Sequence, residues 1–254
     1  MKKIELRFEE NGALARMVLN APKANILDAE MISEATEAIR SAAGRAEVKL
    51  LVVTGAGDHF SFGASVEEHQ AEPAKKMIPA FGRLFLTLLE TGLPTLAAVR
   101  GQCLGGGMEL AVACSWVFAH PSAKFGQPEI RLGVFPPVAA LILPEIAGQA
   151  VADDICLTGR TLSAQEAKEA RLVHTVAESL DDAVLTHFRT NLAPHSAASL
   201  RIALLASRYG LRDRFLTSWA RMERLYLDEL MSTHDANEGI GAFLQRRAPN
   251  WLHR

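Results

Sequence analysis

Apolar residues follow two different spacings in the first fifth of the chain. Residues 4–8 and 13–19 are short apolar-rich runs, and the Asn11-Gly12 pair between them is typical of a tight turn joining antiparallel strands. From Asp28 to residue 39, apolar side chains recur every three or four positions, which is helical spacing. Asp28 is placed to cap that helix. This part of the sequence therefore predicts a β-hairpin followed by a helix.

The middle of the chain alternates predicted strands with predicted helices. Residues 48–54 and 95–99 are continuous apolar runs typical of buried strands, and residues 115–119 predict a third strand. Helical spacing extends through residues 81–89, and a run of glycines at 105–107 opens another predicted helix that reaches residue 113. Because strands and helices keep recurring, the sequence predicts a layered α/β core.

The strand pattern stops at about Pro194. Between Asp213 and Met231, large apolar side chains recur at helical spacing in a stripe wide enough to pack against a large surface. That surface is either the core of the same chain or another subunit. We therefore divide the sequence into an α/β core, residues 1–193, and a C-terminal helical segment, residues 194–254.

Composition narrows the classes of protein that these elements can build. The chain has 254 residues, of which 49% are hydrophobic and 22% charged, enough for one sizeable buried core. Its net charge of −2 gives no global basic field for nucleic acid or an anionic membrane. The first residues alternate apolar and charged side chains, unlike a secretory signal, so we expect a cytoplasmic protein. Three widely spaced cysteines predict neither a zinc site nor a disulfide framework.

The first segment that carries chemistry combines three glycines at 105–107 with Glu109. Consecutive glycines at a helix start leave backbone N–H groups uncovered, at the positive end of the helix dipole, where they bind an anion or an oxygen that becomes anionic. No lysine of a phosphate-binding loop follows them. Tight packing of the helix against a strand explains such glycines equally well. Glu109, in an otherwise apolar helix, either points outward or is held inside for a purpose.

Glu129 follows Glu109 by 20 residues, across one predicted strand and a loop. Carboxyl groups that share a dry pocket have pKa values pushed apart, so that one holds a proton while the other accepts one. General acid–base chemistry needs such a pair. A position on the surface is the alternative for Glu129, as it is for most glutamates.

A third segment follows the predicted strand at 48–54. Gly63 and the small Ala64 allow the backbone to approach a ligand closely, which makes the Ala64 N–H a candidate second donor. Ser65 is not in the elbow of a serine hydrolase, because Gly-x-Ser-x-Gly requires glycine where Glu67 stands.

Together these segments resemble the crotonase superfamily of enoyl-CoA hydratases and isomerases, nearly from end to end. Residues 23–27 are similar to the early coenzyme-contacting loop of that family, and residues 62–66 to its first oxyanion segment. Residues 105–110 and 125–129 match its two catalytic segments at the hydratase spacing. Residues 157–167 and 238–243 resemble later signatures.

The resemblance implies an α/β fold, a crotonase-like spiral of ββα units, with a C-terminal helical segment that mediates trimer contacts. Trimers of this family commonly pair into hexamers. It also implies that the Ala64 and Gly106 N–H groups hold a thioester oxygen, that Glu109 acts as base toward water, and that Glu129 delivers a proton to carbon. No metal or separate cofactor is implied, since coenzyme A is part of the substrate.

The same resemblance implies a set of substrate and coenzyme contacts, namely Lys23, Ala24, Ser65, Val66 and Phe243. For Lys23 a solvated loop charge is the alternative, and for Phe243 it is ordinary helix packing.

Retention of both glutamates favours hydration over double-bond isomerisation. Residues 60–69 and 132–137 resemble those of hydratases that act on a cyclic conjugated dienoyl thioester in anaerobic benzoyl-CoA breakdown. The chain departs from common hydratases where Ser65 replaces an aspartate and residues 137–140 replace a glycine-rich turn, which puts straight-chain specificity in doubt. The alternatives are a general short-chain hydratase, an isomerase, a non-catalytic crotonase-fold protein that binds RNA, and a nucleotide-binding domain.

Overall fold

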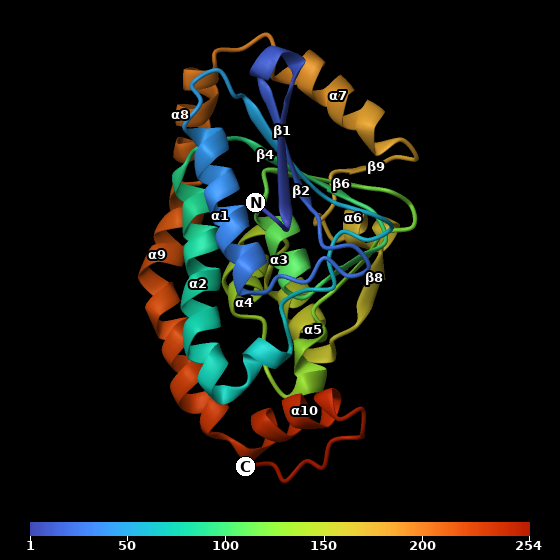
Figure 1. Cartoon of the computed structure of the whole chain (residues 1–254), viewed down its shortest axis with the longest axis vertical. Helices are drawn as coiled ribbons and strands as arrows, with labels where there is room; N and C mark the ends of the chain where they lie inside the picture. The colour runs from blue at the N-terminus through green and yellow to red at the C-terminus, as the bar shows by residue number, and fades with distance from the viewer.

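A six-stranded sheet forms the centre of the protein in the computed structural model, which describes residues 1–254 (Figure 1). Its strand order is β1-β2-β3-β4-β6-β9, and only the first pair is antiparallel. The strands are β1 (Ile4–Glu9), β2 (Leu14–Leu19), β3 (Leu50–Gly55), β4 (Thr95–Val99), β6 (Trp116–Ala119) and β9 (Thr175–Val176). The predicted hairpin and the three predicted buried strands are confirmed, with β3 beginning two residues later than expected.

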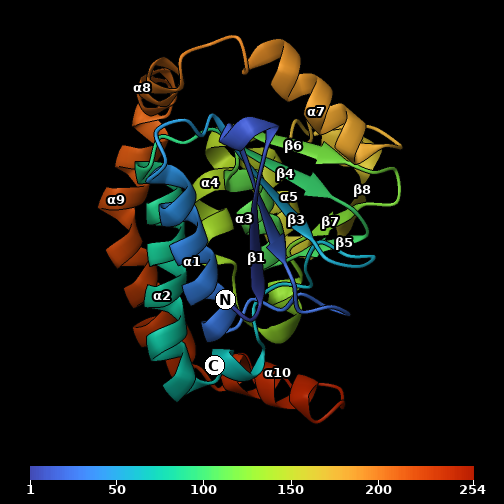
Figure 2. The ribbon, with the colours of Figure 1, turned by 45° about the horizontal axis from the view of Figure 1, so that its top comes forward.

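Both faces of this sheet are covered, which explains the continuous apolar runs of its strands. Leu51 and Val53 of β3 point into the larger core cluster, whereas Leu50 and Val52 point into a smaller one on the opposite face. Helices α1 (Ala29–Ala43) and α2 (Ala71–Glu90) cover the first face, and α7 (Leu180–Asn191) covers the second (Figures 1 and 2). The side-chain oxygen of Asp28 accepts from the Met31 N–H at 3.0 Å, which confirms the predicted cap.

A second, three-stranded sheet lies beside the first and was not predicted. It consists of β5 (Gln102–Leu104), β7 (Lys124–Gly126) and β8 (Thr161–Ser163), with β5 and β7 parallel. Three residues are too few to show an alternation of apolar and polar side chains, so no sequence pattern marks these strands. The remaining helices before the C-terminal segment are α3 (Gly106–Ala113), α4 (Pro137–Ile146), α5 (Gln149–Thr158) and α6 (Ala164–Glu169).

The C-terminal segment is helical, as predicted, and packs into the same core as the sheet. Its helices are α8 (Ala197–Ser207), α9 (Tyr209–Arg224) and α10 (His234–Leu244), and α9 runs beside α2 along one flank of the molecule (Figures 1 and 2). Phe215 and Trp219 are buried between α9 and the core, and a Cβ on Gly82 of α2 would lie 2.1 Å from the Trp219 ring. Most of the apolar stripe thus packs on the chain's own core.

The helix predicted for residues 213–231 differs in detail. The regular helix begins earlier, at Tyr209, and ends at Arg224, after which a π-helical turn (Leu225–Glu229) and a 3₁₀ turn (Leu230–Ser232) complete the segment. The hydrophobic pattern continues through these turns because Tyr226 and Met231 still face the core. None of the helices combines the length and apolar character that a bilayer crossing requires.

Candidate active site

A cavity of about 660 Å³ opens beside the ends of the small sheet. Segments distant in the sequence form its walls: residues 24–26, residues 62–69, Leu104 with Gly105, residues 128–132, and residues of α10 with the tail that follows it. It therefore brings together the loop at 62–66, the glycine run and the Glu129 segment, which the sequence singled out separately.

The loop before α2 is held in place by backbone hydrogen bonds on both sides. On one side the Leu27 N–H donates to the Gly63 carbonyl at 2.9 Å, and on the other the Leu104 N–H of β5 donates to the Ser61 carbonyl at 3.0 Å. The Ser61 hydroxyl also accepts from the Gly63 N–H at 3.0 Å. The loop therefore runs like a short strand between residue 27 and β5.

This ladder places the Ala64 N–H close to the start of α3. A Cβ built on Gly106 would lie 3.3 Å from the Ala64 nitrogen, and one built on Gly63 would lie 3.3 Å from the Gly106 nitrogen. Gly63 has a φ of +102°, which favours glycine. Neither the Ala64 nor the Gly106 N–H donates to a protein acceptor. Two neighbouring unpaired amides are thus available for one oxygen atom.

Glu109 lies inside the protein, two residues after the glycine run. Its side chain is 2% exposed, and its Oε1 accepts from the Ala139 N–H at 2.7 Å. Ala139 belongs to the first turn of α4, whose N–H groups and helix dipole favour the ionised carboxylate. Burial raises the pKa of Glu109 to about 7, and the Ala139 and Val138 N–H groups oppose that rise.

Glu129 follows β7, in the 3₁₀ turn Pro128–Leu132, and lines the cavity. Its carboxylate lies directly over Gly105, because a Cβ on that residue would be 2.5 Å from Glu129 Oε1. With its amide nitrogen turned toward the carboxylate, Gln127 lies 3.1 Å from Glu129 Oε2. Burial, and next the nearby Glu109, raise the pKa of Glu129 well above its ordinary value.

The topology of the small sheet explains why the two carboxylates meet. β5 and β7 are parallel neighbours, with Leu104 opposite Gly126, so both strands end at the same edge of the sheet. Glu109 follows β5 on α3 and Glu129 follows β7. Glu109 contacts the N-terminus of α4, which favours its ionised form, whereas burial and the nearby Glu109 favour the protonated form of Glu129.

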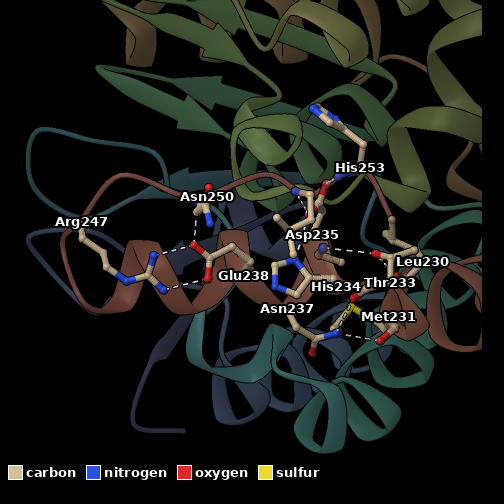
Figure 3. A network of polar contacts seen from close by, with 12 residues as sticks. Leu230, Met231, Thr233, His234, Asp235, Asn237, Glu238, Arg247, Asn250 and His253 are labelled. Carbon is tan, nitrogen blue, oxygen red and sulfur yellow. Dashed lines mark hydrogen bonds and ion pairs between the residues drawn. The ribbon is translucent and has the colours of Figure 1, made fainter.

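One wall of the cavity is built by the C-terminal tail, which folds back over α10 (Figure 3). Arg247 forms a two-pronged ion pair with Glu238 at 2.5 and 2.8 Å, and the Asn250 N–H donates to the same carboxylate at 2.7 Å. Asp235 accepts from the backbone N–H groups of Leu252 and His253. These contacts hold the tail beside Phe243, which lines the cavity and is 55% exposed.

The sequence-predicted site residues fall into two groups. Those that line the cavity are Ala24, Ala64, Ser65, Val66, Glu129 and Phe243. Glu109 and Gly106 do not line it, although Gly106 directly follows the lining residue Gly105, and Lys23 is an exposed loop residue with a φ of +94° that does not line the cavity either.

Sequence reasoning did not single out four other polar side chains that line the cavity: Glu67, His69, Arg131 and Arg247. His69 follows the 62–66 loop by only three residues, so its place in the sequence was a signal. Arg247 is brought in by the fold-back of the tail, which no local pattern indicates.

The fold of two sheets with a C-terminal helical segment, and the cavity at the strand ends, define a crotonase-type protein. The chain belongs to the enoyl-CoA hydratase/isomerase family, whose sequence model matches residues 9–254. It is accordingly a lyase of the enoyl-CoA hydratase type.

Individual relatives support this assignment. The chain is 42% identical to the cyclohexa-1,5-dienecarbonyl-CoA hydratase of Thauera aromatica, over 99% of this chain and 97% of the relative. It is 33% identical to the 2,3-dehydroadipyl-CoA hydratase of Escherichia coli, over 98% and 99%. A crystal structure of an enoyl-CoA hydratase from Mycobacterium avium superposes with a TM-score of 0.88 at 27% identity, covering 99% of this chain and 100% of that one.

Proposed function

We propose that the protein adds water to cyclohexa-1,5-diene-1-carbonyl-CoA and forms 6-hydroxycyclohex-1-ene-1-carbonyl-CoA, in the cytoplasmic breakdown of benzoyl-CoA. The observation that carries the reaction type is the pair of buried carboxylates, in different surroundings, beside two unpaired backbone amides. The full-length similarity to a hydratase of this substrate supports the cyclic acyl group.

In this proposal the thioester oxygen accepts hydrogen bonds from the Ala64 and Gly106 N–H groups. Attack on the conjugated system drives negative charge onto that oxygen. Donors already aimed at the position of the charge stabilise the transition state more than the ground state, and one such donor is worth about 10²–10³-fold in rate.

The two carboxyl groups then divide the proton transfers. Glu109, ionised at the N-terminus of α4, takes a proton from the attacking water. Glu129, whose raised pKa favours the protonated form, delivers its proton to carbon. Each of these steps is general acid–base catalysis, worth about 10²–10⁴-fold.

The chemistry of the cyclic diene fixes where oxygen and proton go. Hydroxide adds to ring carbon 2, the position β to the thioester carbonyl, and the charge spreads over a dienolate that reaches carbon 5. A proton delivered to carbon 5 leaves a double bond conjugated with the thioester. Renumbering the ring makes that product the 6-hydroxy-1-ene. The hydroxyl group and the proton are therefore added to two different ring atoms, carbon 2 and carbon 5, which are reached from carbon 1 in opposite directions around the ring.

Two other activities of the same fold lead to different products. A general short-chain hydratase would act best on an open-chain enoyl thioester, and an isomerase would move the double bond without taking up water. The uncharged Ser65 in the cavity wall and the proline-started helix α4 beside Glu109 favour a bulky apolar ring. A non-catalytic RNA-binding protein has no need for two buried carboxylates.

We extend the proposal to coenzyme contacts and assembly. Lys23, Ala24 and Phe243 are proposed to contact coenzyme A, and Ser65 and Val66 the acyl group. Exposed apolar side chains on α8 and α9, Ile202 and Leu216 among them, are proposed to be covered by self-association into trimers or hexamers.

We expect kcat/KM to rise with pH between about 6 and 8. Glu109 must be ionised to act as a base, and its pKa of about 7 means that the ionised fraction increases through this range. The rate should fall again at higher pH, where Glu129 loses the proton that it delivers. Initial rates followed by the absorbance of the conjugated thioester measure this profile, and a rate that falls from pH 6 to 8 would contradict the assignment of Glu109 as base.

The substrate is tested by comparing purified protein with cyclohexa-1,5-diene-1-carbonyl-CoA and with crotonyl-CoA under one set of conditions. We expect kcat/KM to be at least tenfold higher for the cyclic thioester, with one oxygen from ¹⁸O-labelled water in the product. A preference for crotonyl-CoA would refute the assignment of the cyclic substrate but would leave the assignment as a hydratase intact. A product without ¹⁸O would indicate that the protein catalyses isomerisation rather than hydration.

A further inference from the structure

A buried histidine in the cavity wall has no role in the reaction described above. His69 ends the 3₁₀ turn Glu67–His69, which directly follows the loop of the Ala64 amide. Its side chain is only 8% exposed, yet it lines the same cavity as Glu129. It thus presents a polar atom to the bound acyl thioester from the side of the oxyanion amides.

The protonation state of His69 follows from its contacts. Nδ1 lies 2.7 Å from the carbonyl oxygen of Ser65, and because a carbonyl oxygen only accepts, Nδ1 must carry the hydrogen. Burial lowers the pKa of the imidazole, so the ring is neutral near pH 7. Nε2 is therefore an unprotonated acceptor. No protein group donates a hydrogen bond to Nε2, and protein atoms do not fully enclose it.

An aromatic wall fixes the orientation of this ring. Tyr226, in the π-helical turn Leu225–Glu229, packs against His69 with 6.4 Å between ring centroids, and Phe135 packs on Tyr226 at 5.3 Å. Tyr226 is fully buried and its hydroxyl has no partner. The wall therefore supports the imidazole and leaves Nε2 to whatever occupies the cavity.

A ligand that displaces water from Nε2 without offering a donor leaves this acceptor unsatisfied, which is costly, so Nε2 discriminates between ligands that offer a donor and ligands that do not. The ring of the diene substrate carries no O–H or N–H group. The hydrated ring carries one hydroxyl. Only the oxygenated acyl group can satisfy Nε2.

We propose that His69 is a specificity-determining residue whose Nε2 accepts a hydrogen bond from the hydroxyl group that hydration places on the acyl ring. This inference rests on the proposed function. It adds to that function a group that selects a hydroxylated acyl thioester over the same thioester without oxygen.

The test compares two thioesters that differ only in this hydroxyl, 6-hydroxycyclohex-1-ene-1-carbonyl-CoA and cyclohex-1-ene-1-carbonyl-CoA. Their Kd values are measured by calorimetry in a Glu109→Gln background, which limits turnover. Into this background are introduced His69→Leu, which removes the acceptor at similar size, His69→Gln, which places an amide oxygen near Nε2, and Tyr226→Phe, which keeps the aromatic wall. Thermal unfolding checks that each variant folds.

We expect His69→Leu to weaken binding of the hydroxylated thioester about fivefold, since a neutral hydrogen bond contributes about 1 kcal/mol. Binding of the other thioester should change less than twofold, and His69→Gln and Tyr226→Phe should retain most of the preference. Equal weakening of both thioesters, no change for either, or loss of the preference in Tyr226→Phe but not in His69→Leu would overturn the proposal. Hydration of the diene by the wild-type protein reports separately on the proposed function.

Discussion

Replacing Glu109 or Glu129 with glutamine is expected to lower kcat for hydration by about 10²–10⁴-fold in each case. Glutamine keeps the volume of the side chain but can neither take a proton from water, the role proposed for Glu109, nor deliver one to carbon, the role proposed for Glu129. Because the two groups act on one water and one enolate, the double variant should lose little more than the worse single variant.

Two controls distinguish a loss of catalysis from a loss of substrate binding or from a general effect of a Glu-to-Gln substitution. The Kd for a saturated acyl-CoA should stay within about threefold of the wild-type value, since the Ala64 and Gly106 amides, which are proposed to hold the thioester oxygen, are unchanged. Glu178→Gln, at an 84% exposed side chain, serves as the surface control and should hydrate at the wild-type rate. Wild-type rates in either active-site variant would refute the proposed mechanism.

The second large effect is expected from Gly105→Ala, a change of one methyl group. Gly105 has a φ of +49°, and its new Cβ would lie 2.5 Å from Glu129 Oε1. The carboxylate must therefore move away from its present position in the cavity wall. A misplaced catalytic group costs about 10²-fold in rate, so we expect kcat to fall by about that factor or more.

Gly148→Ala separates backbone strain from the displaced carboxylate. Gly148 also has a positive φ, +88°, but a Cβ there meets nothing within 4 Å. Both alanine variants should lose about 1 kcal/mol or more of unfolding free energy, measured in denaturant, because both place a side chain in the left-handed region. Only Gly105→Ala should lose activity. Similar kinetic losses in both would show that strain, rather than the contact with Glu129, is responsible.

Much of the fold could be predicted from the sequence because its elements have periodic patterns. The buried strands β3 and β4 appear as continuous apolar runs, since helices cover both faces of the large sheet. The start of α1 was marked by Asp28, whose cap depends only on residues within one turn. The absence of strands after about Pro194 was likewise visible in the sequence.

Other elements have no signal of their own. The three-residue strands of the small sheet are too short for periodicity, and they form because longer elements bring their backbones together. The π-helical turn at Leu225–Glu229 is invisible to a hydrophobic pattern, because Tyr226 faces the core in either kind of helix. The fold-back of the tail is held by the ion pair between Arg247, which lies after the end of α10, and Glu238, which lies within α10. No local sequence pattern indicates this contact.

The sequence by itself determined which residue types the site contains: amides freed by glycines, a glutamate on an apolar helix, and a second glutamate 20 residues later. Only the tertiary structure decided that they meet, because β5 and β7 become parallel neighbours that end at one edge. It also decided that the two glutamates differ, because only Glu109 contacts the N-terminus of α4. A pKa is set by the dielectric surroundings and charges within a few ångströms in space, and these come from segments that are remote along the chain.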